Sequence, residues 1–141
     1  NIFVAGFIGS PQMNLIDAKL VKNSDDMVLM FGSNSVKLPK SKAEKLGAYV
    51  DKTVIMGIRP EDLNDTEMFI ASSPDSVIEA EIRVYELLGA EVYLYFDIED
   101  KSCTARVNPR TTARPGDKIK LALDMTKLHL FDKDTELVIP C

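Results

Sequence analysis

The stretch VIEAEIRV (Val77–Val84) decides the fold class of this chain. Apolar and charged residues alternate along it, and in an extended strand such alternation sends the two kinds to opposite faces. The apolar face would carry Ile78, Ala80, Ile82 and Val84. A strand with one buried face and one solvated face is typical of antiparallel sheets and small barrels.

The same period of two recurs along the chain. It is strongest in VYLYFDI (residues 92–98) and KIKLALDM (118–125), and weaker in LIDAKLV (15–21), TVIMGI (53–58) and CTARV (103–107). The core-facing positions would be Val92, Leu94, Phe96 and Ile98 in the first, and Ile119, Leu121, Leu123 and Met125 in the second. We expect these faces and that of VIEAEIRV to line one shared core.

Turn residues separate these segments. GSNS (residues 32–35), LLGAE (87–91) and RPGD (114–117) each predict a turn between strands. Ser41 and Glu44 have capping-box spacing, which predicts a short helix that Gly47 would end. IFVAGFIG (2–9) predicts either a further helical turn or a buried strand. The fold class predicted is all-β with one or two short helices, as an OB-like small Greek-key barrel.

Composition narrows the class of protein. The chain has 141 residues, 45% of them hydrophobic and 28% charged, which suits one globular domain over residues 1–141. The net charge of −5 argues against a nucleic-acid binder. Two cysteines, Cys103 and Cys141, give no disulfide framework and favour a reducing cytoplasm. No apolar run approaches the ~20 residues that cross a bilayer.

The first residues, NIFVAGFIGS, are apolar but lack the cationic start of a signal peptide and an initiator methionine. We therefore expect a fragment or a processed chain.

Two acidic stretches invite a chemical interpretation. In GIRPEDL (residues 57–63), Glu61 and Asp62 could bind a cation, but adjacent side chains of an extended segment diverge. They fit better at the start of a turn or helix after Pro60, where carboxylates are favoured. DKDTE (132–136) begins like a calcium loop but has Leu137 where that loop needs glycine. Both stretches are predicted to be structural.

The remaining candidates also give no site. The single histidine, His129, excludes a multi-histidine metal centre, and its leucine neighbours predict a half-exposed strand position. Tyr93 and Tyr95 lie opposite the apolar face, where cross-strand packing or a protein contact is favoured over base stacking. No GxxxxGK[ST] phosphate loop occurs. We assign no catalytic, cofactor-binding or metal-binding residue.

Five segments, taken in order, resemble a known family. They are FVAGFIGSPQMN (residues 3–14), GIRPED (57–62), ELLGAE (86–91), PGD (115–117) and LHLFDKDT (128–135). Together they resemble the C-terminal regulatory part of the ATP-binding subunit of sugar ABC importers, the maltose/multiple-sugar class. The resemblance covers essentially the whole chain. One departure is that the family commonly has a Thr-Gly turn where Thr135 is followed by Glu136.

The resemblance implies a fold and a set of partners. The fold is the OB-like transport-associated (TOBE) barrel. ATP and Mg would belong to a preceding domain that this chain lacks, so the chain would need no cofactor and would be no enzyme. The implied partners are a second copy of the ATPase subunit, the membrane subunits of the transporter and, in some members, regulatory proteins. The implied location is cytoplasmic, at the inner face of the cell membrane.

Three alternatives remain open. A nucleic-acid-binding OB module would need a basic, aromatic groove, which the net charge and the absence of tryptophan disfavour. A ligand-sensing module would need aromatic platforms, for which Tyr85, Tyr93 and Tyr95 are available. The same domain could also serve an importer of polyamine, glycerol phosphate or iron.

Overall fold

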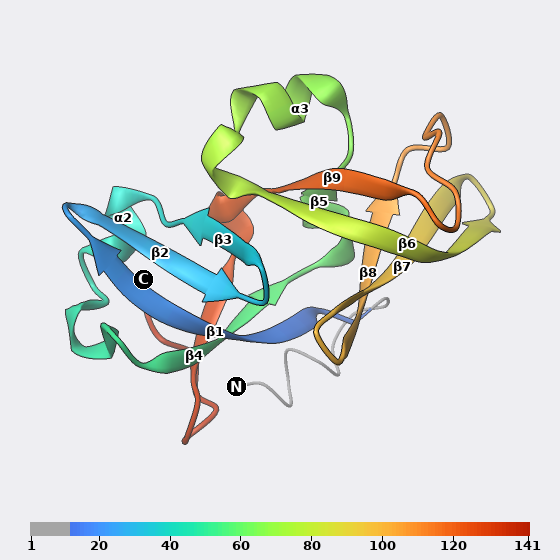
Figure 1. Cartoon of the computed structure of the whole chain (residues 1–141). Helices are drawn as coiled ribbons and strands as arrows, with labels where there is room; N and C mark the ends of the chain where they lie inside the picture. Colours follow the sequence, from blue (N-terminus) through green and yellow to red (C-terminus); the bar gives the residue numbers. More distant parts are fainter. Residues whose placement is uncertain (1–11) are drawn as a thin grey trace.

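The computed structural model describes residues 12–141 (Figure 1). Ten strands make up most of it: β1 (Asn14–Asn23), β2 (Asp26–Phe31), β3 (Asn34–Lys37), β4 (Thr53–Ile58), β5 (Leu63–Asn64), β6 (Val77–Leu88), β7 (Glu91–Ile98), β8 (Lys101–Val107), β9 (Lys118–Leu123) and β10 (His129–Asp132). The α-helices are α2 (Lys40–Ala43) and α3 (Glu67–Ser72). The 3₁₀ turns are η1 (Gly47–Tyr49), η2 (Pro60–Asp62), η3 (Pro74–Ser76) and η4 (Met125–Lys127). The all-β prediction with short helices is confirmed. The prediction for IFVAGFIG lies outside the described residues.

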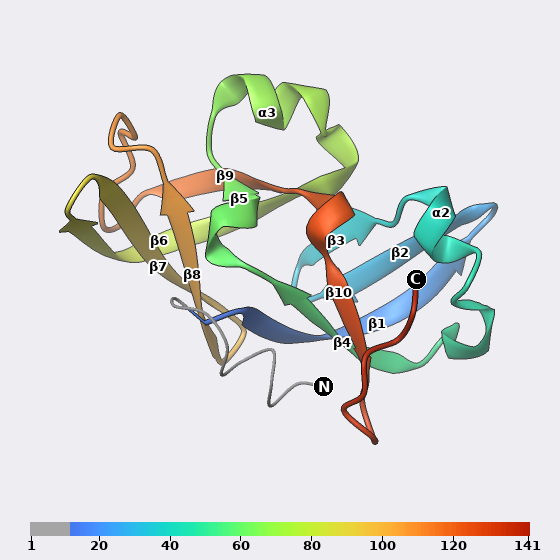
Figure 2. The ribbon, with the colours of Figure 1, turned by 180° about the vertical axis from the view of Figure 1, so that it is seen from behind.

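Two antiparallel five-stranded sheets enclose the core. Their orders are β10-β4-β1-β2-β3 and β5-β9-β6-β7-β8. The last strand, β10, returns to the edge of the first sheet beside β4, as Figure 2 shows from behind. Buried side chains of both sheets form one continuous cluster. The curled sheets therefore make an OB-like half-barrel around a shared core.

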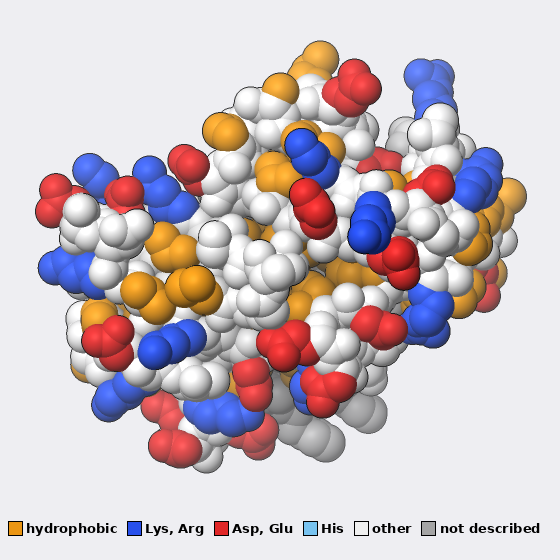
Figure 3. Space-filling model, in the orientation of Figure 1, with side chains coloured by type: hydrophobic (Ala, Val, Ile, Leu, Met, Phe, Trp, Pro, Cys, Tyr) orange, Lys and Arg blue, Asp and Glu red, His pale blue; other side chains and the backbone are white. Residues whose placement is uncertain are grey.

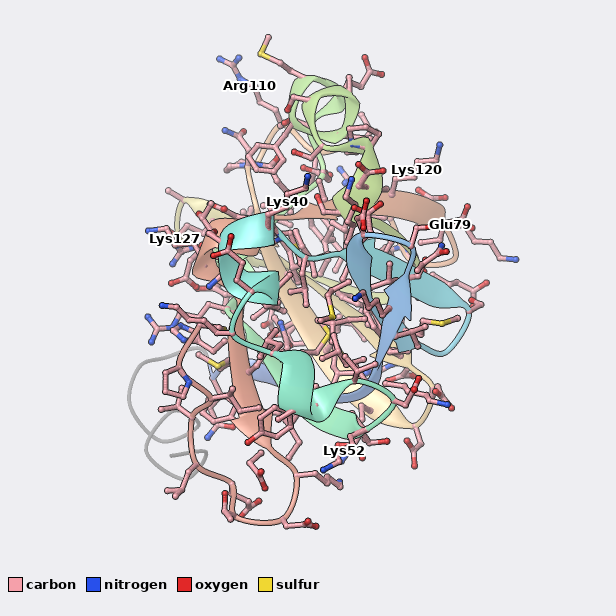
Figure 4. The ribbon with its side chains drawn as sticks, turned by 90° about the vertical axis from the view of Figure 1, so that its left-hand side faces the viewer. Lys40, Lys52, Glu79, Arg110, Lys120 and Lys127 are labelled. Carbon is pink, nitrogen blue, oxygen red and sulfur yellow. The ribbon has the colours of Figure 1, made fainter. Side chains whose placement is uncertain are left out.

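At most positions of the predicted strands, the alternation of apolar and polar residues matches the alternation of buried and exposed side chains. Phe96 has no exposed surface, and the other apolar positions of residues 92–98 are buried with it. On the outer side of β6, Glu79 lies opposite Lys120 (Figure 4). Glu81 lies opposite Lys118 on the same side. Such cross-strand pairs of opposite charge stabilise a solvated face.

One core prediction is wrong. Val84 is 40% exposed, although the alternation places it inside. The cause is a β-bulge, because Ile82 faces Phe96 whereas Val84 faces Tyr95, and Arg83 is the extra residue between them. The inserted residue reverses the facing of everything after it. Ile119, also expected inside, is only half-buried.

The turns are confirmed and the helix start is corrected. Two-residue connections join β2 to β3 and β6 to β7, and Gly89 and Gly116 have positive φ values of 62° and 92°. Helix α2 begins after Pro39 with no side-chain cap, so Ser41 lies inside the helix and forms no capping box. The helix ends before Gly47, which opens η1. Helix α3 has no counterpart among the sequence predictions, and none of its residues is buried.

Candidate functional site

The segment GIRPEDL forms the end of β4 and the turn η2. Gly57 lies on the outer side of β4, covered by Met13 and Phe131, so a side chain there would overlap the Met13 Sδ. Glu61 and Asp62 occupy the first turn of η2 behind Pro60, as the sequence predicts. Burial raises the pKa of the Asp62 carboxyl, and the nearby carboxylates of Glu61 and Asp124 add to that rise.

The acidic loop DKDTE closes on itself. The Asp132 carboxylate accepts the backbone N–H groups of Asp134 and Thr135, each at 2.9 Å, and the Tyr49 hydroxyl at 3.0 Å. The hydrogen bond from the Thr135 N–H is the main reason that the pKa of Asp132 lies below its usual range. Within residues 12–141, no three His, Cys, Asp or Glu side chains are placed to hold a metal ion. Asp132 is thus used to shape the loop.

His129 lies half-buried on β10, opposite Gly57 of β4. Burial lowers its pKa, and the positive charges of Arg59 and Lys42 lower it further. The Lys42 ammonium lies nearby because it donates to the Leu128 carbonyl at 3.3 Å. These surroundings therefore favour the neutral imidazole over the charged form.

The tyrosines that could have formed a ligand platform are engaged within the chain. Tyr95 donates to Glu86 at 2.8 Å, and Tyr93 donates to Glu91 at 3.2 Å. The bond to Glu86 raises the pKa of the Tyr95 phenol. Both hydroxyl groups thus donate hydrogen bonds to carboxylates on the outer side of the second sheet.

Neither the remaining tyrosine of that set nor two surface pockets supply a ligand platform. The Arg114 guanidinium covers the Tyr85 ring, 4.4 Å from its centroid. Two surface pockets, of about 380 and 330 Å³, have no aromatic wall. The space enclosed between the sheets, beside Phe96, measures about 10 Å³, close to the room of one water molecule.

An exposed apolar surface lies on the outer side of the second sheet. We call it the β6–β8 outer face and define it by Val84, Glu86 and Leu88 of β6, Tyr93 and Tyr95 of β7, and Arg106 of β8. Val84 is 40% exposed and Leu88 is 52% exposed. Figure 3 shows apolar side chains gathered at this end of the molecule, where β6 and β7 meet. The adjacent apolar pair Val84-Tyr85, which breaks the alternation, is the sequence signal that could have revealed this surface.

A second exposed apolar pair lies at the C-terminal hairpin, which we define as residues 132–138. Leu137 is 56% exposed and Val138 is 51% exposed. This hairpin also carries three carboxylates, and its one lysine, Lys133, pairs with Asp17 at 2.8 Å. The two apolar surfaces thus differ in charge.

Two family models match consecutive parts of the chain. The MalK OB fold domain matches residues 9–63, and the TOBE domain matches residues 72–130. The chain belongs to the MalK OB fold and TOBE domain families. The first match covers β1 to β4, the second covers β6 to β9, and α3 lies almost wholly in the gap between them. Strand β10 then returns the end of the chain to the sheet of the first match.

Curated relatives of this MalK OB fold and TOBE chain are ATP-binding subunits of sugar importers. The oligosaccharides import ATP-binding protein MsmX of Bacillus subtilis is 41% identical over 99% of this chain and 38% of its own length. The multiple sugar-binding transport ATP-binding protein MsmK of Streptococcus mutans is 37% identical over 99% of this chain and 37% of its length. The trehalose/maltose import ATP-binding protein MalK of Thermococcus litoralis is 36% identical over 96% of this chain and 36% of its own length. The chain thus spans little more than a third of these relatives.

A solved structure supports the fold. The cytoplasmic molybdate-binding protein ModG superposes with a TM-score of 0.60 at 11% identity, over 83% of this chain and 94% of that one. This likeness extends to the fold alone. No helix among residues 12–141 is long and apolar enough to cross a membrane.

Proposed function

We propose that this chain is the non-catalytic regulatory and dimerisation domain of the ATP-binding subunit of an ABC importer for sugars. The observation that carries the proposal is the order of the MalK OB fold and TOBE segments in one chain. Relatives named as sugar-import ATP-binding proteins match 96–99% of it. ATP binding and hydrolysis would belong to another part of such a subunit, because this sequence has no phosphate-binding loop.

The structure supplies a rigid platform suited to that role. One core holds both sheets, and the last strand ties the second family segment back to the first sheet. A contact on one sheet could therefore be transmitted to the other through the shared core. The domain would steady two ATPase subunits on the cytoplasmic face of the membrane while their nucleotide domains open and close. It would contact the second copy, the membrane subunits through the parent, and regulatory proteins.

A domain exchange tests the role. The matching segment of the Bacillus subtilis oligosaccharide-import subunit, 41% identical, is replaced by this chain, and sugar uptake is measured in cells. We expect uptake to be retained, because the two domains share a fold and a family. A subunit lacking the segment is the control. A folded exchange subunit that hydrolyses ATP but supports no more uptake than the control would contradict the proposal.

A binding measurement tests the non-catalytic part. Titration of the 141-residue chain with Mg-ATP in a calorimeter should give no heat of binding, because the sequence has no loop shaped for phosphates. Micromolar affinity, or hydrolysis that persists through purification, would show that the chain has its own nucleotide chemistry.

A further inference from the structure

We propose that Met68 is a site of reversible oxidation, at which a hydroperoxide converts the thioether to a sulfoxide while the domain stays folded. Met68 lies in α3 and is 84% exposed, the largest exposure of any large apolar side chain among residues 12–141. Figure 1 places α3 at the periphery of the molecule, and Figure 3 shows apolar side chains at the surface over this helix. The Met68 thioether is therefore open to small oxidants in the solvent.

The other five methionines are better protected, and all six lie within residues 12–141. Met30 is 49% exposed on β2, where its neighbours on the flanking strands are Lys19 of β1 and Ser35 of β3. The remaining four are at most 9% exposed: Met13, Met27, Met56 and Met125. A buried sulfur reacts only in the fraction of molecules whose segment is open. Exposure therefore predicts the order Met68, then Met30, then the four buried methionines.

The step at Met68 balances with a hydroperoxide as the oxidant. A lone pair of the sulfur attacks the terminal oxygen of the peroxide, so that the S–O bond forms and the O–O bond breaks. The departing oxygen takes the hydroperoxide proton and leaves as an alcohol, or as water where the oxidant is hydrogen peroxide. The sulfur loses two electrons and the peroxide gains them. This chemistry needs no neighbouring catalytic group, so an exposed position suffices.

The fold does not depend on the Met68 side chain. No residue of α3 is buried, and Met68 belongs to neither core cluster. The helical turn is closed by the Ile70 N–H, which donates to the Thr66 carbonyl at 3.0 Å. A sulfoxide oxygen at Met68 would be solvated by water, whereas one at the fully buried Met56 would place a polar group in the core.

Oxidation would thus change the surface chemistry of α3 rather than its fold. Phe69 and Ile70 are half-buried, so Met68 is the large apolar side chain that α3 presents to solvent. A sulfoxide is polar and chiral, and any apolar contact made through Met68 would be weakened. Dithiol-dependent reductases reverse the change: two thiols become a disulfide, the sulfoxide oxygen leaves as water, and the thioether returns.

The two cysteines are the competing reductants. Cys103 is 2% exposed, and burial raises the pKa of its thiol to about 11, so little of the reactive thiolate is present near neutral pH. Cys141 is only half-buried. Oxidation must therefore be located residue by residue, because the mass of the intact chain alone would not separate Met68 from Cys141.

Peptide mapping by mass spectrometry tests the assignment. The 141-residue chain is treated with excess hydrogen peroxide near neutral pH, and the oxidation of each methionine and of Cys141 is followed in time. The same chain unfolded in urea is the reference, because all six methionines are then exposed. Met68→Leu and Met30→Leu are the matched variants. Both positions are exposed, so the domain should stay folded, and circular dichroism with thermal unfolding verifies this.

In the folded chain we expect Met68 to be oxidised first and Met30 next, with the four buried methionines at least about tenfold slower than in urea. Met68→Leu should lose the earliest methionine oxidation, and Met30→Leu should keep it. In Met30→Leu, the chain oxidised at Met68 should keep its unfolding temperature. Methionine sulfoxide reductases A and B together should then restore its mass, since each acts on one sulfoxide epimer.

The proposal is wrong if Met30 or a buried methionine is oxidised before Met68, or if all six react alike in the folded chain. It is also wrong if oxidation at Met68 alone unfolds the domain. Failure of the two reductases to act on the folded, oxidised chain would overturn the reversibility. None of these outcomes depends on the transporter that the domain serves, so this inference and the proposed function can fail independently.

Discussion

The side-chain amide of Asn14 bonds both backbone groups of Thr104. Its Nδ2 donates to the Thr104 carbonyl at 2.8 Å, and its Oδ1 accepts the Thr104 N–H at 2.8 Å. Asn14 begins β1 of the first sheet, and Thr104 lies in β8 of the second, 90 residues later. Because β1 and β8 are not paired by a backbone ladder, this buried side chain takes the place of a neighbouring strand.

Removing the Asn14 amide should therefore separate the two sheets at this point. We expect Asn14→Ala to lower the free energy of unfolding by about 1–3 kcal/mol, since two backbone groups lose their partners. Urea denaturation at pH 7 measures the loss. Lys22→Ala, on the exposed end of β1, is the control and should change stability by no more than about 0.5 kcal/mol. An equal effect of the two substitutions would show that the amide bonds do not support the fold.

Gly57 has a packing reason that its sequence context did not reveal. A Cβ there would overlap the Met13 Sδ and lie 3.1 Å from the Phe131 ring. We expect Gly57→Ala to cost about 1–3 kcal/mol, because the outer cluster of Met13, Ile55 and Phe131 must shift. Chemical denaturation measures the cost. Gly47→Ala is the matched control, because its Cβ would meet nothing within 4 Å, and it should be nearly neutral.

A double-mutant cycle identifies the cause of the Gly57 effect. Met13→Ala removes the side chain that the added methyl group at position 57 would overlap. The two substitutions together should cost less than the sum of the single costs, by about 0.5–3 kcal/mol. Strict additivity would show that the Gly57→Ala cost arises elsewhere, for instance from the backbone of β4.

His129 should make stability depend on pH. Its pKa in the folded protein lies below the ordinary 6.5, so the unfolded chain binds the proton more tightly. Stability from this residue is therefore complete above pH 6.5 and declines as the pH falls from there toward the folded pKa. We expect His129→Gln to reduce the loss of unfolding free energy between about pH 7.5 and pH 5.5.

Because His129 is the only histidine, its titration can be followed directly by proton NMR. Lys42→Met removes one of the two positive charges that lower its pKa, so the titration midpoint should rise in that variant. A midpoint at or above 6.5 in the unaltered protein would contradict the pH prediction.

The strand pattern predicted the fold, and the deviations came from contacts that a one-dimensional pattern does not contain. Alternation placed Phe96 inside because facing repeats every two residues. It misplaced Val84 because the extra residue Arg83 depends on pairing with β7. Ser41 has the right spacing for a cap, yet Pro39 occupies the capping position and Ser41 lies inside the helix.

The candidate surface was still less predictable. The bulge in β6 determines which side chains lie on the exposed face of the second sheet. The ion pairs on that face, such as Arg106 with Glu91, determine its charge. These partners lie on different strands, so the sequence order does not show them. The architectural role of GIRPEDL was predicted, but its physical reason, the Met13 side chain over Gly57, required the structure.

Glu136 occupies a backbone conformation suited to glycine. Its φ is +60°, in the left-handed region, where a side chain costs about 1 kcal/mol or more. This is the position at which the resemblance in sequence showed a departure from a Thr-Gly turn. The Glu136 N–H donates to the Asp132 carbonyl at 2.9 Å, so the loop keeps the glycine-type turn despite the larger residue.

Replacing Glu136 by glycine should therefore stabilise the protein. We expect Glu136→Gly to raise the free energy of unfolding by about 0.5–1 kcal/mol, because relief of the left-handed strain exceeds the added backbone entropy of the unfolded chain. Glu136→Ala removes the same carboxylate from beside Asp134 but keeps the Cβ, so it separates charge from conformation. Urea midpoints at pH 7 should rank glycine above both alanine and glutamate. If alanine stabilises as much as glycine, the gain comes from lost charge repulsion, and the backbone at residue 136 is not strained.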